Sequence, residues 1–260
     1  MTGRRGFALL AVLWVVAALA AIVGLGLGTL RIGARGSANR LELARGRWAA
    51  EACLAIAQAR WNEHRFTDTA SVDLGRETWC SWRADDPTAR VNINTAPATL
   101  LLALVQHVEA APQLVDSLLA HRPYADTAQV RTTLSSDTSL LAFLTTDGPG
   151  TINLNAAAPP VILSIPGLGA EVVDQLRESA RQTRPVASLD QLASQVPGER
   201  SELLAHYADL AAQVTFAPSQ LLLTAAGWVG DGGPDGLHAT IEVLVVPLPD
   251  RLAVIRRRLW

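Results

Sequence analysis

Residues 7–30 form an unbroken run of 24 residues without a charged side chain, and they begin directly after Arg4, Arg5 and Gly6. A helix of that length can span the roughly 30 Å hydrocarbon core of a bilayer. Beyond the run, apolar residues recur at three- and four-residue spacing, at Leu41, Ala44, Trp48, Ala52, Ala55 and Ala59. The pattern predicts one long helix that reaches about His64 and packs its second half on a folded domain through these six side chains.

The apolar run admits three interpretations. A cleaved secretory signal would be cut after Ala18-Leu19-Ala20, but the run continues ten residues past Ala20 without a polar stretch. An ordinary membrane anchor would stay uncleaved. A leader of the type IV pilin kind would be six residues long and cut between Gly6 and Phe7, with Phe7 a candidate for N-methylation. The pair Gly6-Phe7 after two arginines favours this third interpretation, in which the helix is retained.

The charges that flank the run point both ways. Two arginines precede it and five follow, at Arg31, Arg35, Arg40, Arg45 and Arg47, so a count of flanking positive charges would place the N-terminus outside. Because the leader is short and basic, and because long domains translocate largely regardless of charge, we predict the opposite orientation. The domain that follows the helix would then lie on the outer side of the membrane.

A carboxylate that pilin-like subunits usually carry is missing here. Most of them have Glu at the fifth mature position, where it pairs with the α-amino group of a neighbouring subunit inside the filament. Counting from Phe7, this position is Ala11. An unpaired charge in that apolar setting would cost several kcal/mol, so a subunit without a partner there is better served by an alanine. Either the pilin interpretation is wrong, or this subunit takes a place where no such pair is required, and the natural candidate is the first subunit, at the filament tip.

The middle of the chain is duplicated. Asn92, Asn94 and Ala96 match Asn153, Asn155 and Ala157, each 61 residues apart, and His121-Arg122-Pro123 parallels Thr183-Arg184-Pro185. We predict two repeats, at about residues 90–150 and 151–213. Asn-x-Asn followed by proline is typical of a strand-like entry into a helix, with asparagine side chains capping the free amides and proline in the first turn.

The second repeat contains the sequence Ile-Pro-Gly-Leu-Gly at residues 165–169. Gly167 and Gly169 fit a tight turn between helices. The same turn occurs in helix-hairpin-helix DNA-binding modules, so an exported DNA-binding protein is the alternative function. The first repeat lacks the glycine pair, the neighbouring charges are mixed, and the formal net charge of the chain is −2, whereas DNA binding requires a basic surface. The sequence therefore favours a packing turn and no nucleic-acid partner.

Other chemistry is sparse. Cys53 and Cys80 either form one disulfide, which would close a loop of roughly 27 residues, or remain two buried thiols. Acidic loop residues that could contribute to a calcium site are Asp85, Asp86, Asp231 and Asp235, without a complete ligand spacing. Five histidines lie scattered, and no G-x-S-x-G, P-loop or C-x-x-C motif occurs. We predict no catalytic activity and no required cofactor.

Together these motifs resemble the type II secretion system protein K family, the K minor pseudopilins of the general secretion pathway. The residues that carry the resemblance are Arg4-Arg5-Gly6-Phe7 without glutamate at Ala11, the repeated Asn-x-Asn motifs and the Ile-Pro-Gly-Leu-Gly turn. The resemblance covers essentially the whole chain. It implies a subunit of the bacterial inner membrane with one membrane pass and a periplasmic C-terminal domain, placed at the pseudopilus tip. The implied partners are the I and J minor pseudopilins, the major pseudopilin filament and the prepilin peptidase, and some relatives bind calcium.

The resemblance also implies an α+β pseudopilin fold, in which a long N-terminal helix packs on a small antiparallel sheet that carries a large helical insertion. The expected division is a leader at 1–6, a transmembrane half-helix at 7–30, a core at 31–89 and 214–260, and an inserted helical domain at 90–213. Strand-like alternation in the core occurs at residues 77–83, 220–228, 238–246 and 252–260, with a turn-rich segment at 230–236.

Overall fold

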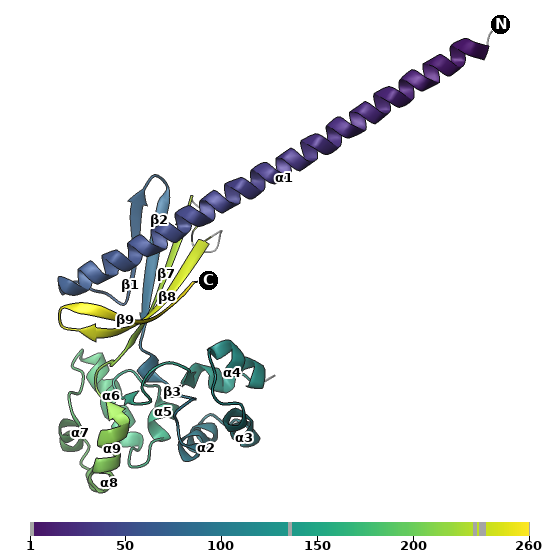
Figure 1. The fold of residues 1–260 in the computed structure, drawn as a ribbon. Coiled ribbons are helices and arrows are strands. Elements are labelled where there is room, and N and C mark those ends of the chain that lie inside the picture. The colour runs from purple at the N-terminus through teal and green to yellow at the C-terminus, as the bar shows by residue number, and fades with distance from the viewer. Residues whose placement is uncertain (1–2, 135–136, 231–232, 234–237, 260) are drawn as a thin grey trace.

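The computed structural model of the chain describes residues 3–134, 137–230, 233 and 238–259, with side chains described at residues 12–25 and from residue 33 onward. Its first element is the helix α1 (Gly3–Asn62), which is continuous over 60 residues. The N-terminal half of α1 projects away from the body of the protein, and its C-terminal half lies across a sheet (Figure 1). The expected long helix is therefore present. Among the described residues, no helix combines the length and hydropathy that a membrane crossing needs.

The core sheet has five antiparallel strands in the order β1-β2-β7-β8-β9. The strands are β1 (Thr69–Gly75), β2 (Thr78–Asp85), β7 (Leu221–Val229), β8 (His238–Leu248) and β9 (Arg251–Leu259). Four of them coincide with the segments of strand-like alternation. Strand β1 was not predicted, although its sequence TASVDLG alternates polar and apolar residues and Ala70, Val72 and Leu74 pack against the core of the sheet, so this signal was missed.

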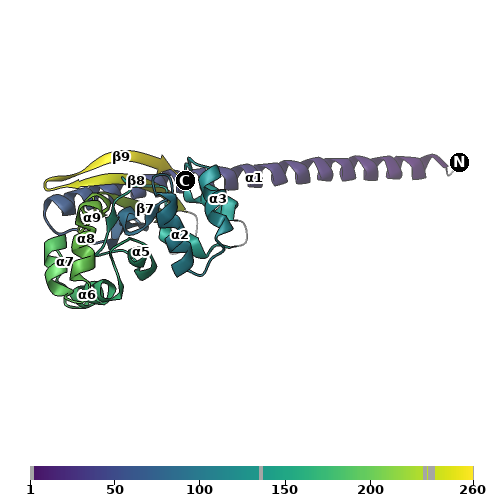
Figure 2. The ribbon, with the colours of Figure 1, turned by 90° about the horizontal axis from the view of Figure 1, so that it is seen from below.

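Between β2 and β7 the chain forms a separate helical layer below the sheet (Figures 1 and 2). After η1 (Pro87–Ala89), the first repeat runs through β3 (Val91–Asn92), α2 (Ala98–His107), α3 (Gln113–Ala120), α4 (Thr127–Leu134), η2 (Ser139–Phe143) and β4 (Leu144–Thr145). The second runs through β5 (Ile152–Asn153), α5 (Pro159–Leu163), α6 (Ala170–Arg181), α7 (Leu189–Gln195), α8 (Arg200–Ala205), α9 (Tyr207–Gln213) and β6 (Val214–Thr215). The sheet and the insertion have separate hydrophobic cores, and both repeats contribute to the core of the insertion. The α+β class is confirmed.

The face of α1 that packs on the sheet differs from the predicted one. The buried residues are Gly46, Ala49, Ala50, Cys53 and Ala57, whereas the predicted face is mostly exposed, with Trp48 76% exposed. The helical period was correct, but the side chosen was wrong. Because the helix lies very close to the sheet, only the face with the smallest side chains can enter the contact, whatever the hydropathy of its neighbours.

The closest approach lies between Gly46 on α1 and Gly227 on β7. A Cβ atom at Gly46 would lie 2.7 Å from the Gly227 carbonyl oxygen, and one at Gly227 would overlap the Gly46 carbonyl and the Ala50 nitrogen. Nearby, Cys53 of α1 and Cys80 of β2 form a disulfide with a Cα–Cα distance of 5.8 Å. In the chain-entropy view, a closed loop of this length stabilises the fold by about 3–4 kcal/mol. Helix α1 is thus held to the sheet by close backbone packing and by a disulfide bond.

We expect Gly227→Ala to destabilise the core, because the added methyl group must push the helix backbone away from the strand. The expected loss in the free energy of unfolding is about 1–3 kcal/mol, measured by denaturant unfolding of the full chain in detergent. Gly36→Ala on helix α1 is the control, since a Cβ at Gly36 meets nothing within 4 Å. Equal stability of the Gly227→Ala and Gly36→Ala proteins would contradict a tight helix–strand contact.

Candidate functional site

The second asparagine of each motif joins two segments of its own repeat. Asn94 Nδ2 donates to the Tyr124 carbonyl at 3.0 Å, and the Tyr124 amide donates to Asn94 Oδ1 at 2.8 Å. Asn155 makes the same pair of bonds with Val186, at 2.8 and 3.1 Å. Asn155 Nδ2 also donates to the Phe216 carbonyl at 2.7 Å. An amide side chain can satisfy a backbone donor and acceptor at once, so each asparagine fixes a loop that lies about 30 residues further along the chain.

The first asparagine of each motif shapes a local turn. Asn92 Oδ1 accepts from the Asn94 amide at 2.9 Å, and Asn153 Oδ1 accepts from the Asn155 amide at 3.2 Å. Both are asparagine turns, in which the side chain bonds to the backbone two residues on. The prediction that these asparagines cap a helix was wrong. The residues at the N-caps of α2 and α5 are Pro97 and Ala158, and neither provides a side-chain cap.

This kind of side-chain capping occurs two helices later in each repeat, at the starts of α4 and α7. Asp126 Oδ1 accepts from the Gln129 amide at 2.9 Å, and the Ala125 amide donates to Gln129 Oε1 at 2.9 Å. In the second repeat, Ser188 and Gln191 make the corresponding bonds at the start of α7. This is a variant of the capping box, whose signature of a short polar residue followed three positions later by glutamine is visible in the sequence and was overlooked.

The glycine-rich hairpin is closed by a carboxylate from the same chain. Gly167 adopts φ +86°, which favours glycine, and Gly169 is the N-cap of α6. The Glu199 carboxylate accepts from the amides of Gly169 at 3.0 Å, Glu171 at 2.9 Å and Val172 at 3.3 Å. In return the Glu199 amide donates to Glu171 Oε2 at 3.0 Å.

This contact decides what the hairpin can bind. Amides at the start of a helix form an anion site, and here Glu199 occupies it. A DNA phosphate would have to displace a bound carboxylate and approach two acidic side chains, Glu199 and Glu171. The geometry therefore argues against the helix-hairpin-helix DNA-binding alternative. No sequence signal pointed to Glu199, because it lies 30 residues from Gly169 and meets it only through the tertiary fold.

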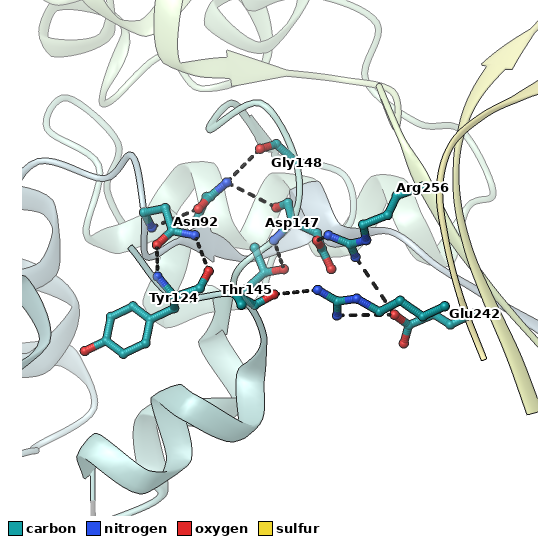
Figure 3. A network of polar contacts seen from close by, with 10 residues as sticks. Asn92, Tyr124, Thr145, Asp147, Gly148, Glu242 and Arg256 are labelled. Carbon is teal, nitrogen blue, oxygen red and sulfur yellow. Dashed lines mark hydrogen bonds and ion pairs between the residues drawn. The ribbon is translucent and has the colours of Figure 1, made fainter. Parts of the chain in front are cut away.

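A polar network connects the insertion to the sheet (Figure 3). Arg256 of β9 lies with Nη1 2.5 Å from Asp147 Oδ1, and its Nη2 is 3.9 Å from Glu242 of β8. The hydrogen bond with Asp147 raises the pKa of Arg256. Asp147 is held in turn by the loop, since its amide donates to Thr145 Oγ1 at 3.1 Å. Only 9% of the Asp147 side chain is exposed, so the contact is largely shielded from water.

The candidate calcium residues that the structure describes are engaged elsewhere. Asp86 Oδ1 accepts from the Thr88 amide at 2.8 Å, and Oδ2 accepts from Asn153 Nδ2 at 2.7 Å. Asp85 Oδ2 lies 2.9 Å from Arg83. Asp231 and Asp235 lie outside the described residues. Within the described part of the chain, no three acidic, histidine or cysteine side chains gather as a metal site would require.

The residues at the predicted cleavage site lie in the first turns of α1. Gly6 and Phe7 belong to the helical backbone, and their side chains lie outside the described set. Processing between them stays a prediction from sequence.

A long N-terminal helix across an antiparallel sheet, with a helical domain inserted between two strands, is the architecture that the resemblance to K-type pseudopilins implies. No protein-family model and no curated protein matches this sequence. Among solved structures, the fold is similar to a chain in the crystal structure of the GspK-GspI-GspJ complex from the Type 2 Secretion System of enterotoxigenic Escherichia coli. The TM-score is 0.55 at 15% sequence identity, with 89% of this chain and 99% of the other covered. The resemblance is thus confirmed at the level of the fold.

We expect Asn155→Ala to destabilise the second repeat, because three backbone partners in two distant loops lose their bonds. The expected loss in the free energy of unfolding is about 2–4 kcal/mol, measured by denaturant unfolding. Asn39→Ala, on the exposed part of α1, is the control and should change stability by less than about 0.5 kcal/mol. A loss no larger than that of the control would show that Asn155 does not hold the loops together.

Replacing Glu199 by alanine removes the acceptor of three amides at the start of α6. The helix cap and the hairpin should then loosen, with a loss of about 1–2 kcal/mol in thermal or denaturant unfolding. Glu202→Ala is the matched control on α8, since the Glu202 side chain is 69% exposed and lies 3.5 Å from His206 Nε2. If both variants unfold alike, the Glu199 carboxylate contributes nothing beyond an ordinary surface charge.

Proposed function

We propose that this chain is a minor pseudopilin of a type II secretion system, of the K type, with a structural role and no catalytic one. The observation that carries the proposal is the fold neighbour, because the similarity spans 89% of this chain and therefore extends beyond the sheet into the insertion. Long helices on small sheets occur in many pilin-like proteins. The large inserted helical domain is the distinguishing part.

The proposed place of the subunit is the pseudopilus tip. A shaft subunit is surrounded by copies packed along its long helix, and a second layer of helices below the sheet would add bulk to every one of those contacts. At the tip this bulk meets no subunit above it. Ala11 supports the same place, since a terminal subunit does not need the carboxylate that would pair with a neighbour's α-amino group.

The proposed setting is the bacterial inner membrane, with residues 7–30 as a single membrane-crossing segment and the folded body in the periplasm. The support is the uncharged run itself, which has the length of a bilayer span. A disulfide between Cys53 and Cys80 fits an oxidising compartment such as the periplasm. The proposed partners are the I and J minor pseudopilins, in keeping with the composition of the complex that contains the fold neighbour, and the major pseudopilin.

We expect a prepilin peptidase to cut this chain between Gly6 and Phe7. Co-production with such a peptidase should yield a mature protein that begins at Phe7, measured by N-terminal sequencing and intact mass, with one added methyl group if Phe7 is methylated. Gly6→Val should abolish processing, because a branched side chain replaces the hydrogen of the residue before the cut, whereas Gly3→Val should leave it intact. A mature start at Ala21, or no processing of the natural sequence, would exclude the pseudopilin route.

A further inference from the structure

The second repeat has an open groove of about 590 Å³. Its walls come from the loop before α7, from α9 and from the segment that follows β6, and they include Val186, Tyr207 and Phe216. Both aromatic side chains are half-buried, so part of each ring faces the opening. All the residues that line the groove belong to the second repeat or to the segment directly after it, and none belongs to the core sheet.

The duplication identifies the equivalent place in the first repeat. Val186 corresponds to Tyr124, because each exchanges two hydrogen bonds with the second asparagine of its motif. Ala187 corresponds to Ala125, because each donates its amide to a glutamine Oε1 four residues on, at 2.8 and 2.9 Å. One wall of the groove is therefore the same structure in both repeats.

The other wall corresponds equally well. Thr145 and Thr215 end the two short parallel pairs, in register with Asn92 and Asn153. Two residues on, the Asp147 amide donates to Thr145 Oγ1 at 3.1 Å, and the Ala217 amide lies 3.5 Å from Thr215 Oγ1. Asp147 and Ala217 thus hold the same position.

In the first repeat this place is occupied by a strand of the same chain. Arg258 of β9 donates to the Ala125 carbonyl at 2.5 Å, and Arg256 pairs with Asp147 (Figure 3). An extended segment with arginines therefore spans both walls. In the second repeat, α7 and α9 lie on the other side of the insertion from α4, and β9 does not line the groove (Figure 1).

Near the second groove an acidic residue is again present, but it stands at a different position from Asp147 of the first repeat. Ala217 stands where Asp147 is, while Asp190 stands where the first repeat has Ala128. Asp190 lies beside Tyr207, whose pKa is raised by burial and also by this carboxylate. No ion pair to Asp190 and no hydrogen bond to the Ala187 carbonyl is found among the described residues. Ala187 and two aromatic side chains thus line an open space, and the exposed Asp190, which is not part of the lining, lies at its edge beside Tyr207.

We propose that the groove of the second repeat binds an extended segment of a partner protein that carries an arginine. The guanidinium donates to the Ala187 carbonyl and to the Asp190 carboxylate, and its flat face and aliphatic stem pack on Tyr207 and Phe216. The mode of binding is the one that β9 shows on the first repeat. This proposal rests on the groove and on the comparison of the two repeats, and it does not depend on a role in secretion.

The probe is a synthetic peptide with the sequence of β9, Arg251–Leu259, and the receptor is the full chain in detergent with ¹³C-labelled tyrosine. The chain has two tyrosines, so Tyr207 reports on the second groove and Tyr124 on the first. A Tyr207→Phe sample assigns the two ring signals. We expect a saturable shift of the Tyr207 signal and no shift of the Tyr124 signal, because the place beside Tyr124 is already filled.

Two controls test the arginine. A peptide with citrulline in place of every arginine keeps the shape and removes the charge, and Asp190→Asn removes the acid beside Tyr207 at the edge of the groove. Either change should weaken binding about threefold or more, whereas Asp174→Asn, an 80% exposed acid on α6, should leave affinity unchanged. The proposal is overturned by no saturable shift of Tyr207, by equal binding of the citrulline peptide, which indicates an apolar occupant, or by equal shifts of both tyrosines.

Discussion

The pairing of β2 with β7 is the constraint on which the rest of the structure depends. These strands are neighbours in the sheet, with Asp85 opposite Leu222, yet the whole helical domain lies between them in the chain. The insertion must therefore leave and re-enter the sheet at two points one strand spacing apart, about 4.8 Å. A domain whose ends meet in this way can be inserted without disturbing the register of its host. Because the ends are fixed side by side, the helical layer has to lie below one end of the sheet.

The insertion meets this requirement by closing each half on itself. Each repeat begins and ends in a short parallel pair, Val91 with Leu144 and Ile152 with Val214. The asparagine motifs then tie the middle loop of each repeat to its start. The two repeats share this backbone arrangement, but their surfaces differ. The first half faces the sheet and is held by Arg256 and Arg258, and the second keeps an open groove and a hairpin closed by Glu199.

Much of the fold could be predicted from the sequence, since its signals are local. Helix α1 follows from an uncharged run with a continuing 3.6-residue period, and four strands follow from alternation between turn residues. The duplication is visible as matching residues 61 positions apart. The errors share a cause. The packed face of α1 depends on how near β7 comes, and the role of Asn155 depends on Val186 and Phe216, so neither could be read from neighbours in the chain.

By itself, then, the sequence determined the long helix, four of the strands and the duplication, because periodicity and repeated motifs carry that information locally. The α+β class and the helical insertion followed from the family resemblance that these motifs carry. Only the tertiary structure decided which residues make the contacts between elements that are distant in the sequence. Gly46 packs against Gly227, and the Glu199 carboxylate accepts from the Gly169 amide. Arg256 pairs with Asp147. The two residues of each pair are separated by many residues of intervening chain. Such pairs are selected by distance and close packing in three dimensions, so each becomes defined only when the elements that carry its two members have come together.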